Sequence, residues 1–582
     1  MDMDQRTGKL FSKLFRIFCV LSVLGGLAAL FFTFAVPSES KNVHFGSYSP
    51  ARWLLGSVTA ALTAFFIFLL IRERQDKGAV SGKLDDYLSR GDRAYFAFLT
   101  SLLGLFISLW MFKFSWLFIP KNLRPQILWL ALMSAAAALF LFITYREKFR
   151  ASNVYEKYRL FPRLRDLSRT QKKSLLVLAV LSLVYIAVLM PSNRNGTRDL
   201  QDFQAYGGDE VVIYPILQDV SDPGNNYSEW LYHHYIHEDY HYGYPFYAVS
   251  YCVLLPFRLF LGPDYMQHIS LTMPTLRIMV SVLPLMLGCV ILVFLTTRFE
   301  NPWISAAVYI FLLTAPGSLQ NNQGFWHPDG LNLFFVCAAL YFLQRDRLRL
   351  GRNFYLCAFF VGLSAATRLF GFFFFLAVGV CLICGARNQC AAAPDKTHRT
   401  VICILRSGLL FLLVMFGTIL WSSPFLFRAD ARQNMTAILT EKSGEMSSGY
   451  NADFSDPKND YRPGWDAWYP AFEDHFTEMF CFFFLIISLG TACFIGREQW
   501  TFRIIFLWWI VVAFYLIRFV AVKSTQYVLP MMLPLMSCIF ALSRALRDLK
   551  DRRFRIAAWL LSAGIFSAQL IINLIKIAPR FR

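Results

Sequence analysis

The chain has 582 residues, of which 56% are hydrophobic, 59 are phenylalanine and only 16% are charged. This composition excludes a soluble enzyme and predicts an all-α polytopic membrane protein. A net charge of +19 would indicate nucleic-acid binding in a soluble chain, but here Lys and Arg concentrate in alternate connections between apolar runs, which the positive-inside rule assigns to the cytoplasm. We therefore expect no nucleic-acid partner.

The first part of the chain contains four apolar runs, at about residues 17–36, 53–71, 94–118 and 126–145. Each approaches or exceeds the roughly 20 residues that a helix needs to cross a bilayer. The first run lacks a small-residue cleavage site, so we expect no cleavable signal peptide. Ten Lys and Arg residues lie between Arg146 and Lys173. We predict a four-span accessory membrane block over residues 1–150 and a basic cytoplasmic linker over residues 151–174.

A fifth span, at about residues 175–190, leads into a polar loop over residues 191–274. The loop holds ten carboxylates and only three Lys or Arg residues, and it is far longer than a connection between spans needs to be. We therefore predict that it roofs a site on the outer face of the membrane. Within it, Tyr244–Leu261 is apolar enough to cross, but a crossing would place the basic segment 345–352 outside. We predict instead that this Tyr-rich helix lies in the outer interface.

The remaining spans are expected at about residues 276–297, 303–318, 329–343, a hairpin of two over 354–384, 404–422, 476–495, 502–522, 526–543 and 556–575. The total is about 15. Residues 175–545 form the predicted core, and residues 546–582 form a last span and a tail. This register places the polar segments 320–328 and 423–475 on the outer face.

Two kinds of polar residue on this face could carry chemistry. Asp209 and Glu210 follow the fifth span, and a carboxylate there could activate an acceptor hydroxyl as a base. Arg277, Arg368 and Lys523 lie within or at the ends of spans, where a cation is costly and therefore indicates function. Such cations could hold an anionic leaving group such as phosphate. The alternatives are a solvated or helix-capping acidic pair and cations that snorkel to lipid headgroups.

Further polar residues lie in two short segments. His327 and Asp329 belong to the segment at the mouth of a span. Four His residues lie between positions 233 and 241 and are either interfacial packing residues or ligands of a divalent metal ion, for which the candidates are His237, Glu238 and His241. The twelve cysteines lie almost entirely in apolar runs and predict no disulfide framework.

From Leu175 onward, the order of these motifs resembles the GT-C superfamily of integral-membrane glycosyltransferases. The likeness is strongest to the branch that contains lipid A aminoarabinose transferases, protein O-mannosyltransferases and Rgt-type enzymes. In chain order the matching motifs are Asp209-Glu210, the helix from Tyr244-Pro245 to Leu259-Phe260-Leu261-Gly262, Arg277, Asp329, the Gly-rich segment Gly362–Arg368, and Tyr527-Val528-Leu529-Pro530. In two places the chain departs from the branch: Arg368 replaces a Lys, and Gly243-Tyr244-Pro245 replaces Glu-Lys-Pro, so the Lys that would hold lipid phosphate is absent.

The resemblance implies a GT-C helical bundle whose outer-face loop bears juxtamembrane helices. It implies an enzyme that transfers a hexosyl or pentosyl unit from a polyprenyl-phosphate donor to a lipid, glycan or protein acceptor. The site would face the periplasmic or extracytoplasmic side of the inner (plasma) membrane. Asp209 would act as base with the support of Glu210, and the residues expected to bind donor phosphate or substrate are Arg277, Arg368, Lys523, Tyr527, His241, Tyr244, His327 and Asp329.

Three further points complete these expectations. No cofactor is implied beyond the divalent metal ion left open above. Trp230, Trp326 and Trp468 could stack on sugar rings. The alternatives to transfer are a transporter or flippase that binds lipid-linked sugar without reacting, and a scaffold subunit, which would need neither Asp209 nor Arg277.

Overall fold

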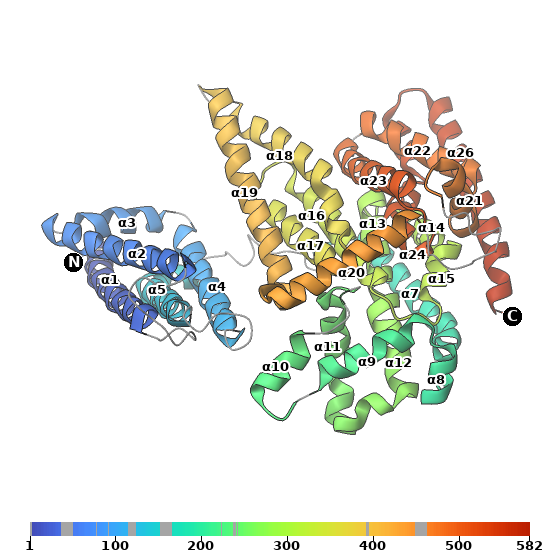
Figure 1. Cartoon of the computed structure of the whole chain (residues 1–582). Helices are drawn as coiled ribbons and strands as arrows, with labels where there is room; N and C mark the ends of the chain where they lie inside the picture. The colour runs from blue at the N-terminus through green and yellow to red at the C-terminus, as the bar shows by residue number, and fades with distance from the viewer. Residues whose placement is uncertain are drawn as a thin grey trace. The chain divides into compact units, whose positions relative to one another are not determined.

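The computed structural model describes residues 3–35, 50–76, 78–90, 92–114, 124–151, 166–222, 224–236, 240, 242–391, 395–448, 462–496 and 498–581. Every regular element in these ranges is a helix, which confirms the predicted all-α class. The chain forms two compact units (Figure 1). The smaller unit comprises residues 1–162 with 226–232, and the larger unit comprises residues 163–225 with 233–582.

The smaller unit is a bundle of four long helices and one short one: α1 (Met3–Ala35), α2 (Pro50–Gln75), α3 (Ala79–Ser89), α4 (Arg93–Phe114) and α5 (Arg124–Ala151). Helix α1 packs against α2 and α5, and α4 packs against α5. Phe11, Phe15 and Phe140 are buried in its core. The Trp129 indole N–H donates to the Ser22 carbonyl oxygen at 3.1 Å, which fixes α5 against α1.

The helices of the larger unit that precede the hairpin described below are α7 (Arg169–Arg194), α8 (Leu200–Tyr206), α9 (Asp209–Ser221), α11 (Tyr244–Leu261), η3 (Pro263–Gln267), α12 (Ile269–Leu276), the π-helix η4 (Arg277–Val282), α13 (Leu283–Thr297), α14 (Pro302–Leu313) and α15 (Pro316–Asn322). Helix α10 (Tyr227–Tyr235) is divided between the units.

The later helices are α16 (Asp329–Asp346), α17 (Arg352–Arg368), η5 (Phe370–Phe374), α18 (Phe375–Cys390), α19 (Lys396–Ser422), η6 (Pro424–Phe427), α20 (Ala429–Ser448), α21 (Trp465–His475), α22 (Met479–Phe494), α23 (Gln499–Phe519), α24 (Thr525–Met536), α25 (Ala541–Ala545), η7 (Leu546–Asp548), α26 (Arg552–Ile577) and η8 (Ala578–Phe581).

The protein is an integral, multi-pass membrane protein. Twelve helices of the described ranges are long and apolar enough to cross a bilayer, or fourteen if each of two bent helix pairs is one span. The count of about 15 from the sequence differs at three helices. Helix α11 qualifies by length and composition, whereas α16 begins and ends with charged residues and α17 has only 17 residues. The bent pairs are α14 with α15, at 67°, and α21 with α22, at 99°.

Helices α16 and α17 form an antiparallel hairpin that organises the larger unit. Its open end brings Asp329, the first residue of α16, to Arg368, the last residue of α17. At its closed end, the Asp346 carboxylate accepts backbone N–H groups from Leu350, Gly351 and Phe354. An α-helix of 18 residues is roughly 27 Å long, so the two ends of the hairpin lie about one hydrocarbon thickness apart. Helix α13 packs on α16, and α19 packs on α17.

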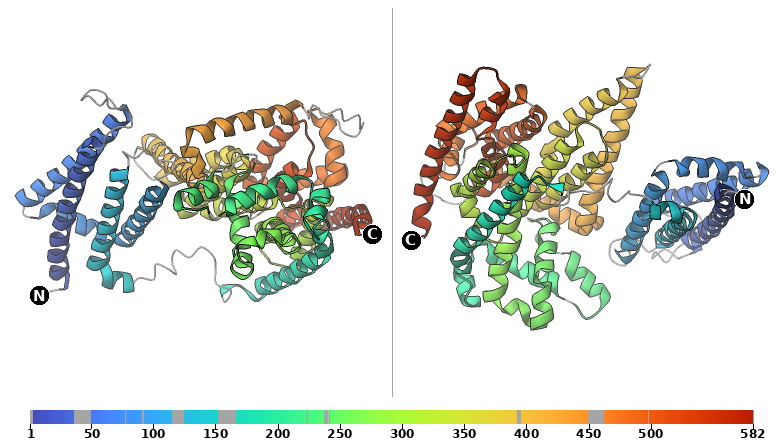
Figure 2. Two further views of the ribbon diagram at one scale, coloured as in Figure 1. Left: turned by 60° about the horizontal axis from the view of Figure 1, so that its bottom comes forward. Right: turned by 180° about the vertical axis from the view of Figure 1, so that it is seen from behind.

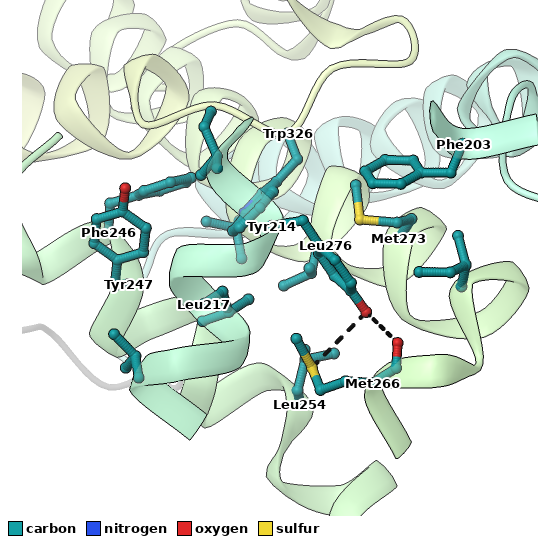
Figure 3. Close-up of a cluster of buried hydrophobic side chains, with 14 of the residues drawn as sticks. Phe203, Tyr214, Leu217, Phe246, Tyr247, Leu254, Met266, Met273, Leu276 and Trp326 are labelled. Atoms are coloured by element: carbon teal, nitrogen blue, oxygen red, sulfur yellow. Dashed lines mark hydrogen bonds between the residues drawn. The ribbon is translucent and has the colours of Figure 1, made fainter. Parts of the chain in front are cut away.

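Helices α8, α9, α11, η3 and α12 gather beyond the open end of the hairpin (Figures 1 and 2), and we call this group the acidic lobe. Its core is a cluster of buried side chains that includes Phe203, Tyr214, Phe246, Met273 and Trp326 (Figure 3). The Tyr214 hydroxyl donates to the carbonyl oxygen of Met266 at 2.6 Å, which fixes α9 to η3. The lobe is therefore a packed part of the larger unit and carries its own apolar core.

Candidate functional site

Glu210 and Arg277 form a buried ion pair where the acidic lobe meets the helical bundle. Their side chains are 0% and 2% exposed. Arg277 Nε donates to Glu210 Oε1 at 2.9 Å, and Nη2 donates to Oε2 at 2.5 Å. The remaining carboxylate capacity is used by the backbone N–H of Trp326, which donates to Oε1 at 2.5 Å. This bidentate geometry joins α9, the π-helix η4 and the loop that precedes α16.

The other side of the Arg277 guanidinium is also occupied. Its Nη1 donates to the backbone oxygens of Asn193 and Asn195, at 2.9 and 2.8 Å. Asn193 in turn donates to Asn322 O and accepts the Gly324 N–H at 3.0 Å. Four of the five guanidinium N–H groups thus have protein acceptors. Arg277, which the sequence predicts to bind donor phosphate, lies in the structure as a brace for Glu210.

A π-helix carries this brace. Arg277 begins the segment, and Ser281 is its fifth residue. The Ser281 hydroxyl accepts the His327 N–H at 2.8 Å and donates to the His327 carbonyl oxygen at 3.0 Å. A Cβ at Gly330 would overlap the Ser281 carbonyl oxygen, so α16 can approach η4 this closely only with glycine there. π-Helical turns often occur at functional sites, and this one positions the residues that lead into Asp329.

The open end of the hairpin holds five polar and aromatic residues, which we call the Arg368 cluster: Tyr242, His327, Asp329, Arg368 and Tyr527. His327 Nδ1 bonds to Asp329 Oδ2, and His327 Nε2 lies 2.9 Å from the Tyr242 hydroxyl. Arg368 Nη2 lies 3.0 Å from His327 Nε2. The guanidinium lies over the ring of Tyr242 at 4.7 Å and over that of Tyr527 at 5.7 Å. Two aromatic faces and one carboxylate therefore hold the cation.

Arg368 differs from Arg277 in what it leaves free. Its Nε lies 3.2 Å from Asp329 Oδ1, yet neither atom has a hydrogen-bond partner among the described residues. The Arg368 side chain is 13% exposed, against 2% for Arg277. A partly exposed guanidinium can receive an oxyanion, and Arg is suited to phosphate.

Gly243 holds Tyr242 against the end of α17. Its N–H donates to the Thr367 carbonyl oxygen at 3.3 Å. A Cβ at this position would overlap the carbonyl oxygen of Ala366. The segment before α11 can therefore approach α17 this closely only with glycine at position 243. Gly243 thereby secures a tyrosine beside Arg368.

Asp209 lies at the first position of α9 with its side chain exposed, next to the fully buried Glu210. Its negative charge acts on both Tyr242 and His327, which places it on the side of the Arg368 cluster. Consecutive residues of an α-helix point about 100° apart, so one carboxylate enters the core and the other remains available. The predicted pair is therefore split into one structural and one accessible acid.

The protonation of the cluster follows from its burial. Burial lowers the pKa of His327, and the adjacent Arg368 lowers it further, against the opposing effect of Asp329. Burial likewise raises the pKa of the Tyr242 hydroxyl, although Arg368 lowers it. A neutral imidazole with its Nδ1–H toward Asp329 can accept hydrogen bonds from Tyr242 and Arg368 at Nε2. Burial also raises the pKa of Glu210, and Arg277 acts in the opposite direction.

The remaining predicted site residues lie in other parts of the larger unit or outside the residues that the structure describes. Lys523 Nζ donates to the Arg462 carbonyl oxygen at 2.6 Å and lies 6.0 Å from the Trp468 ring. Tyr244 is buried against Tyr235, at 5.3 Å between ring centroids. The candidate metal ligands His237, Glu238 and His241 lie outside the described residues. Among the residues that are described, no group of three or more His, Cys, Asp or Glu side chains could hold a metal ion.

The tryptophan prediction is wrong for two of its three residues. Trp326 and Trp468 are 0% exposed, so neither ring has a face for a sugar. The Trp326 indole N–H donates to Ser250 Oγ at 3.1 Å, and the ring packs on Phe246 (Figure 3). The Trp468 N–H donates to the Val520 carbonyl oxygen at 2.8 Å. Both indole rings pack in the core, and their N–H groups bond to buried acceptors instead of a sugar.

Sequence reasoning missed Tyr242, Gly243, Asn193 and Ser281. The Gly-Tyr-Pro segment contained a signal, because a glycine before a helix-opening Tyr-Pro indicates a tight backbone position. Asn193 lies at the start of the predicted polar loop and Ser281 lies within a predicted span, and a single small polar residue is common in both places. Only the packing of three separate segments shows what they bind.

Comparison with known proteins finds no matching family model and no matching curated protein. Among solved structures, the Archaeoglobus fulgidus oligosaccharyltransferase in its apo form is similar to 69% of this chain, at 11% sequence identity and a TM-score of 0.40. The matched part spans 56% of that protein's chain. A likeness of this size does not establish a shared activity.

Proposed function

We propose that this chain is a GT-C type membrane glycosyltransferase that takes sugar from a polyprenyl-phosphate donor. The supporting observation is the pairing of an exposed carboxylate, Asp209, with a partly exposed guanidinium, Arg368. The two groups lie on one side of the larger unit, at the end of the α16–α17 hairpin. A base and an anion-binding cation across one space are what a displacement at a sugar phosphate requires.

In the proposed reaction Asp209 accepts the proton of an acceptor hydroxyl. The acceptor oxygen forms a bond to the anomeric carbon while the bond from that carbon to the phosphate oxygen breaks. The phosphate leaves with the electron pair and gains negative charge. Arg368 stabilises that charge, and Asp329 with Tyr242 and Tyr527 keeps the guanidinium in place. Arg277 and Glu210 act as positioning residues that fix the start of α9.

A lipid-linked donor also fits the composition of the chain. The sugar would already be membrane-bound, so no nucleotide-sugar domain is needed, and the prenyl tail can lie between spans. The acceptor class, whether lipid, glycan or protein, and the placement on the periplasmic or extracytoplasmic side are part of the proposal. Lys523 lies on a different segment of the outer end and could contact a more remote part of the substrate.

The test is release of polyprenyl phosphate from a panel of polyprenyl-phosphate hexoses and pentoses by the purified full-length protein. Total membrane lipid serves as the acceptor source. We expect release by the wild type and a loss of about 10²–10⁴-fold in Asp209→Asn, the range for a general base. Asp264→Asn, which alters an exposed carboxylate of the same lobe, should keep the wild-type rate. Equal rates for Asp209→Asn and wild type would exclude the assignment.

A transporter or flippase of lipid-linked sugar is the second candidate, and the two bent helix pairs favour it. Discontinuous helices line the binding sites of many transporters, and α14–α15 and α21–α22 are bent by 67° and 99°. Proteoliposomes with a fluorescent polyprenyl-phosphate sugar separate the two functions. A transporter moves the intact lipid between leaflets without releasing polyprenyl phosphate, and Asp209→Asn would leave the movement intact.

A further inference from the structure

A basic pocket of about 440 Å³ lies at the closed end of the α16–α17 hairpin, remote from the Arg368 cluster. It is formed by the connection between α16 and α17, the last turn of α18 and the first turns of α19. Arg349, Arg399 and Arg406 line it, together with Tyr355, Gln389 and Ser407. The length of α16, roughly 27 Å, separates this pocket from Asp329.

The three arginines are free to bind an external anion. None of their guanidinium groups forms a hydrogen bond or an ion pair with another of the described residues, and all three side chains are exposed. The nearby carboxylates are used elsewhere. Asp346 accepts three backbone N–H groups, and Asp395 lies 3.7 Å from His398. The pocket therefore carries three uncompensated positive charges.

One face of helix α19 lines the pocket, and this face carries two of the arginines. Its lining residues are spaced at i, i+3, i+4, i+7 and i+8, which is one face of a helix: Arg399, Ile402, Cys403, Arg406 and Ser407. Arg406 stands between the apolar runs 401–405 and 408–421. An arginine inside a candidate span is costly unless it meets a counter-charge, and a phospholipid phosphate would supply one.

Arg349 is supplied by a strained and rigid connection. Arg347, Leu348 and Leu350 all have positive φ, at 50°, 62° and 45°, a conformation that non-glycine residues rarely adopt. Asp346 holds this connection from one side, and Gln389 donates to the Arg349 carbonyl oxygen at 2.5 Å from the other. Strain of this kind persists where the surroundings fix it and often marks a functional site. An arginine that served only to orient the chain in the membrane would not need a connection held in this way.

We propose that this pocket binds the phosphate of an anionic membrane lipid, in the leaflet opposite to the Asp209 site. Three arginines from two segments can surround one phosphate with charge-assisted hydrogen bonds. The apolar runs on both sides of Arg406 would contact the acyl chains. The proposal does not depend on the glycosyltransferase activity.

Native cysteines provide the test. Cys403 lines the pocket and is partly exposed, with its thiol 3.6 Å from Gln389 Oε1, whereas Cys252 is exposed on α11 outside the pocket. The full-length protein in detergent is treated with a maleimide in the presence of phosphatidylglycerol, phosphatidylcholine or sodium phosphate. Modification of each cysteine is followed by peptide mass spectrometry. We expect phosphatidylglycerol to slow modification of Cys403 several-fold and to leave Cys252 unchanged.

Variants establish which charges act. Arg399→Gln and Arg406→Gln should each weaken protection of Cys403 by phosphatidylglycerol about tenfold or more in apparent affinity, the range for losing a charged hydrogen bond. Arg555→Gln, at an exposed arginine in the first turn of candidate span α26, should leave it unchanged. Equal protection by phosphatidylcholine or by inorganic phosphate, or no protection at all, would overturn the lipid assignment. If a variant fails to fold, the comparison of the three additives on the wild-type protein still decides whether the pocket binds an anionic lipid.

Discussion

At the scale of single residues, the site depends on two adjacent carboxylates with opposite environments. Glu210 is enclosed by Arg277 and the Trp326 N–H, whereas Asp209 is exposed and its charge acts on His327 of the Arg368 cluster. From the sequence, Asp209 and Glu210 were predicted to act together, because they are adjacent and share the same neighbours in the chain. The division of roles depends on residues 67 and 116 positions away from Glu210, and no local pattern contains them.

The buried ion pair predicts a specific stability pattern. Arg277→Gln should lower the free energy of unfolding by about 3–5 kcal/mol, because it leaves the Glu210 carboxylate buried without its partner. The melting temperature from circular dichroism measures this. Arg198→Gln, at an exposed arginine of the same loop, should shift it little. If the double variant Glu210→Gln/Arg277→Gln melts below Arg277→Gln, the pair does not behave as a coupled charge pair.

His327 predicts a pH dependence. Burial lowers the pKa of this imidazole below about 6.5, its ordinary value. Between the folded and unfolded pKa values the unfolded chain binds more protons, so stability rises with pH and is complete above about 6.5. The melting temperature should therefore fall on acidification below that pH, and less so in His327→Gln. His398→Gln, at an exposed histidine, serves as the control, and identical pH profiles for His327→Gln and wild type would contradict the assignment.

At the scale of elements, close contact between backbones explains why the Arg368 cluster holds together. Gly243 packs against the end of α17, and Gly330 packs against η4. At both positions a Cβ would overlap a backbone carbonyl oxygen. The sequence located the helices from their apolar runs, because that signal is local. It did not predict the break between α14 and α15, because that break lies inside the apolar stretch 303–318 that is read as one span. The predicted start of a span at residue 476 lies at the break between α21 and α22.

A substitution at Gly243 tests this contact. In Gly243→Ala the new methyl group would force the Tyr242 segment away from Ala366, so Tyr242 would lose its position over the Arg368 guanidinium. We expect a lower melting temperature and a loss of transfer rate of at least tenfold. Gly379→Ala is the matched control, because its Cβ would meet no atom within 4 Å and the helix gains about 0.5–1 kcal/mol. An active, stable Gly243→Ala protein would show that the Tyr242 contact is dispensable.

At the scale of the whole molecule, the length of the hairpin separates two groups of charged residues. Asp329 and Arg368 lie at one end of it, and Arg349 lies at the other. The asymmetry of Lys and Arg suggested this arrangement from the sequence, because charge distribution records orientation. It could not show how the acidic lobe packs, since that follows from contacts such as the hydrogen bond from Tyr214 to Met266.

Cysteine labelling tests the arrangement. In a cysteine-free background, single cysteines at positions 204, 264 and 349 are treated with an impermeant maleimide in sealed vesicles of each orientation. We expect positions 204 and 264 to react from one side and position 349 from the other. Reaction of position 264 from the side of position 349 would mean that α11 crosses the bilayer, and the acidic lobe would not lie at the outer face.

In both ion pairs of the site, the acidic residue precedes the basic residue in the sequence. Glu210 precedes Arg277 by 67 residues, and Asp329 precedes Arg368 by 39, so each anion leaves the ribosome before its cation. An arginine that enters a bilayer alone costs about 2.5–3.5 kcal/mol. At synthesis rates of about 5–20 residues per second, each acceptor is in place seconds before its arginine emerges. The order of synthesis thus allows each cation to be neutralised as it enters the membrane, and the site can assemble during translation.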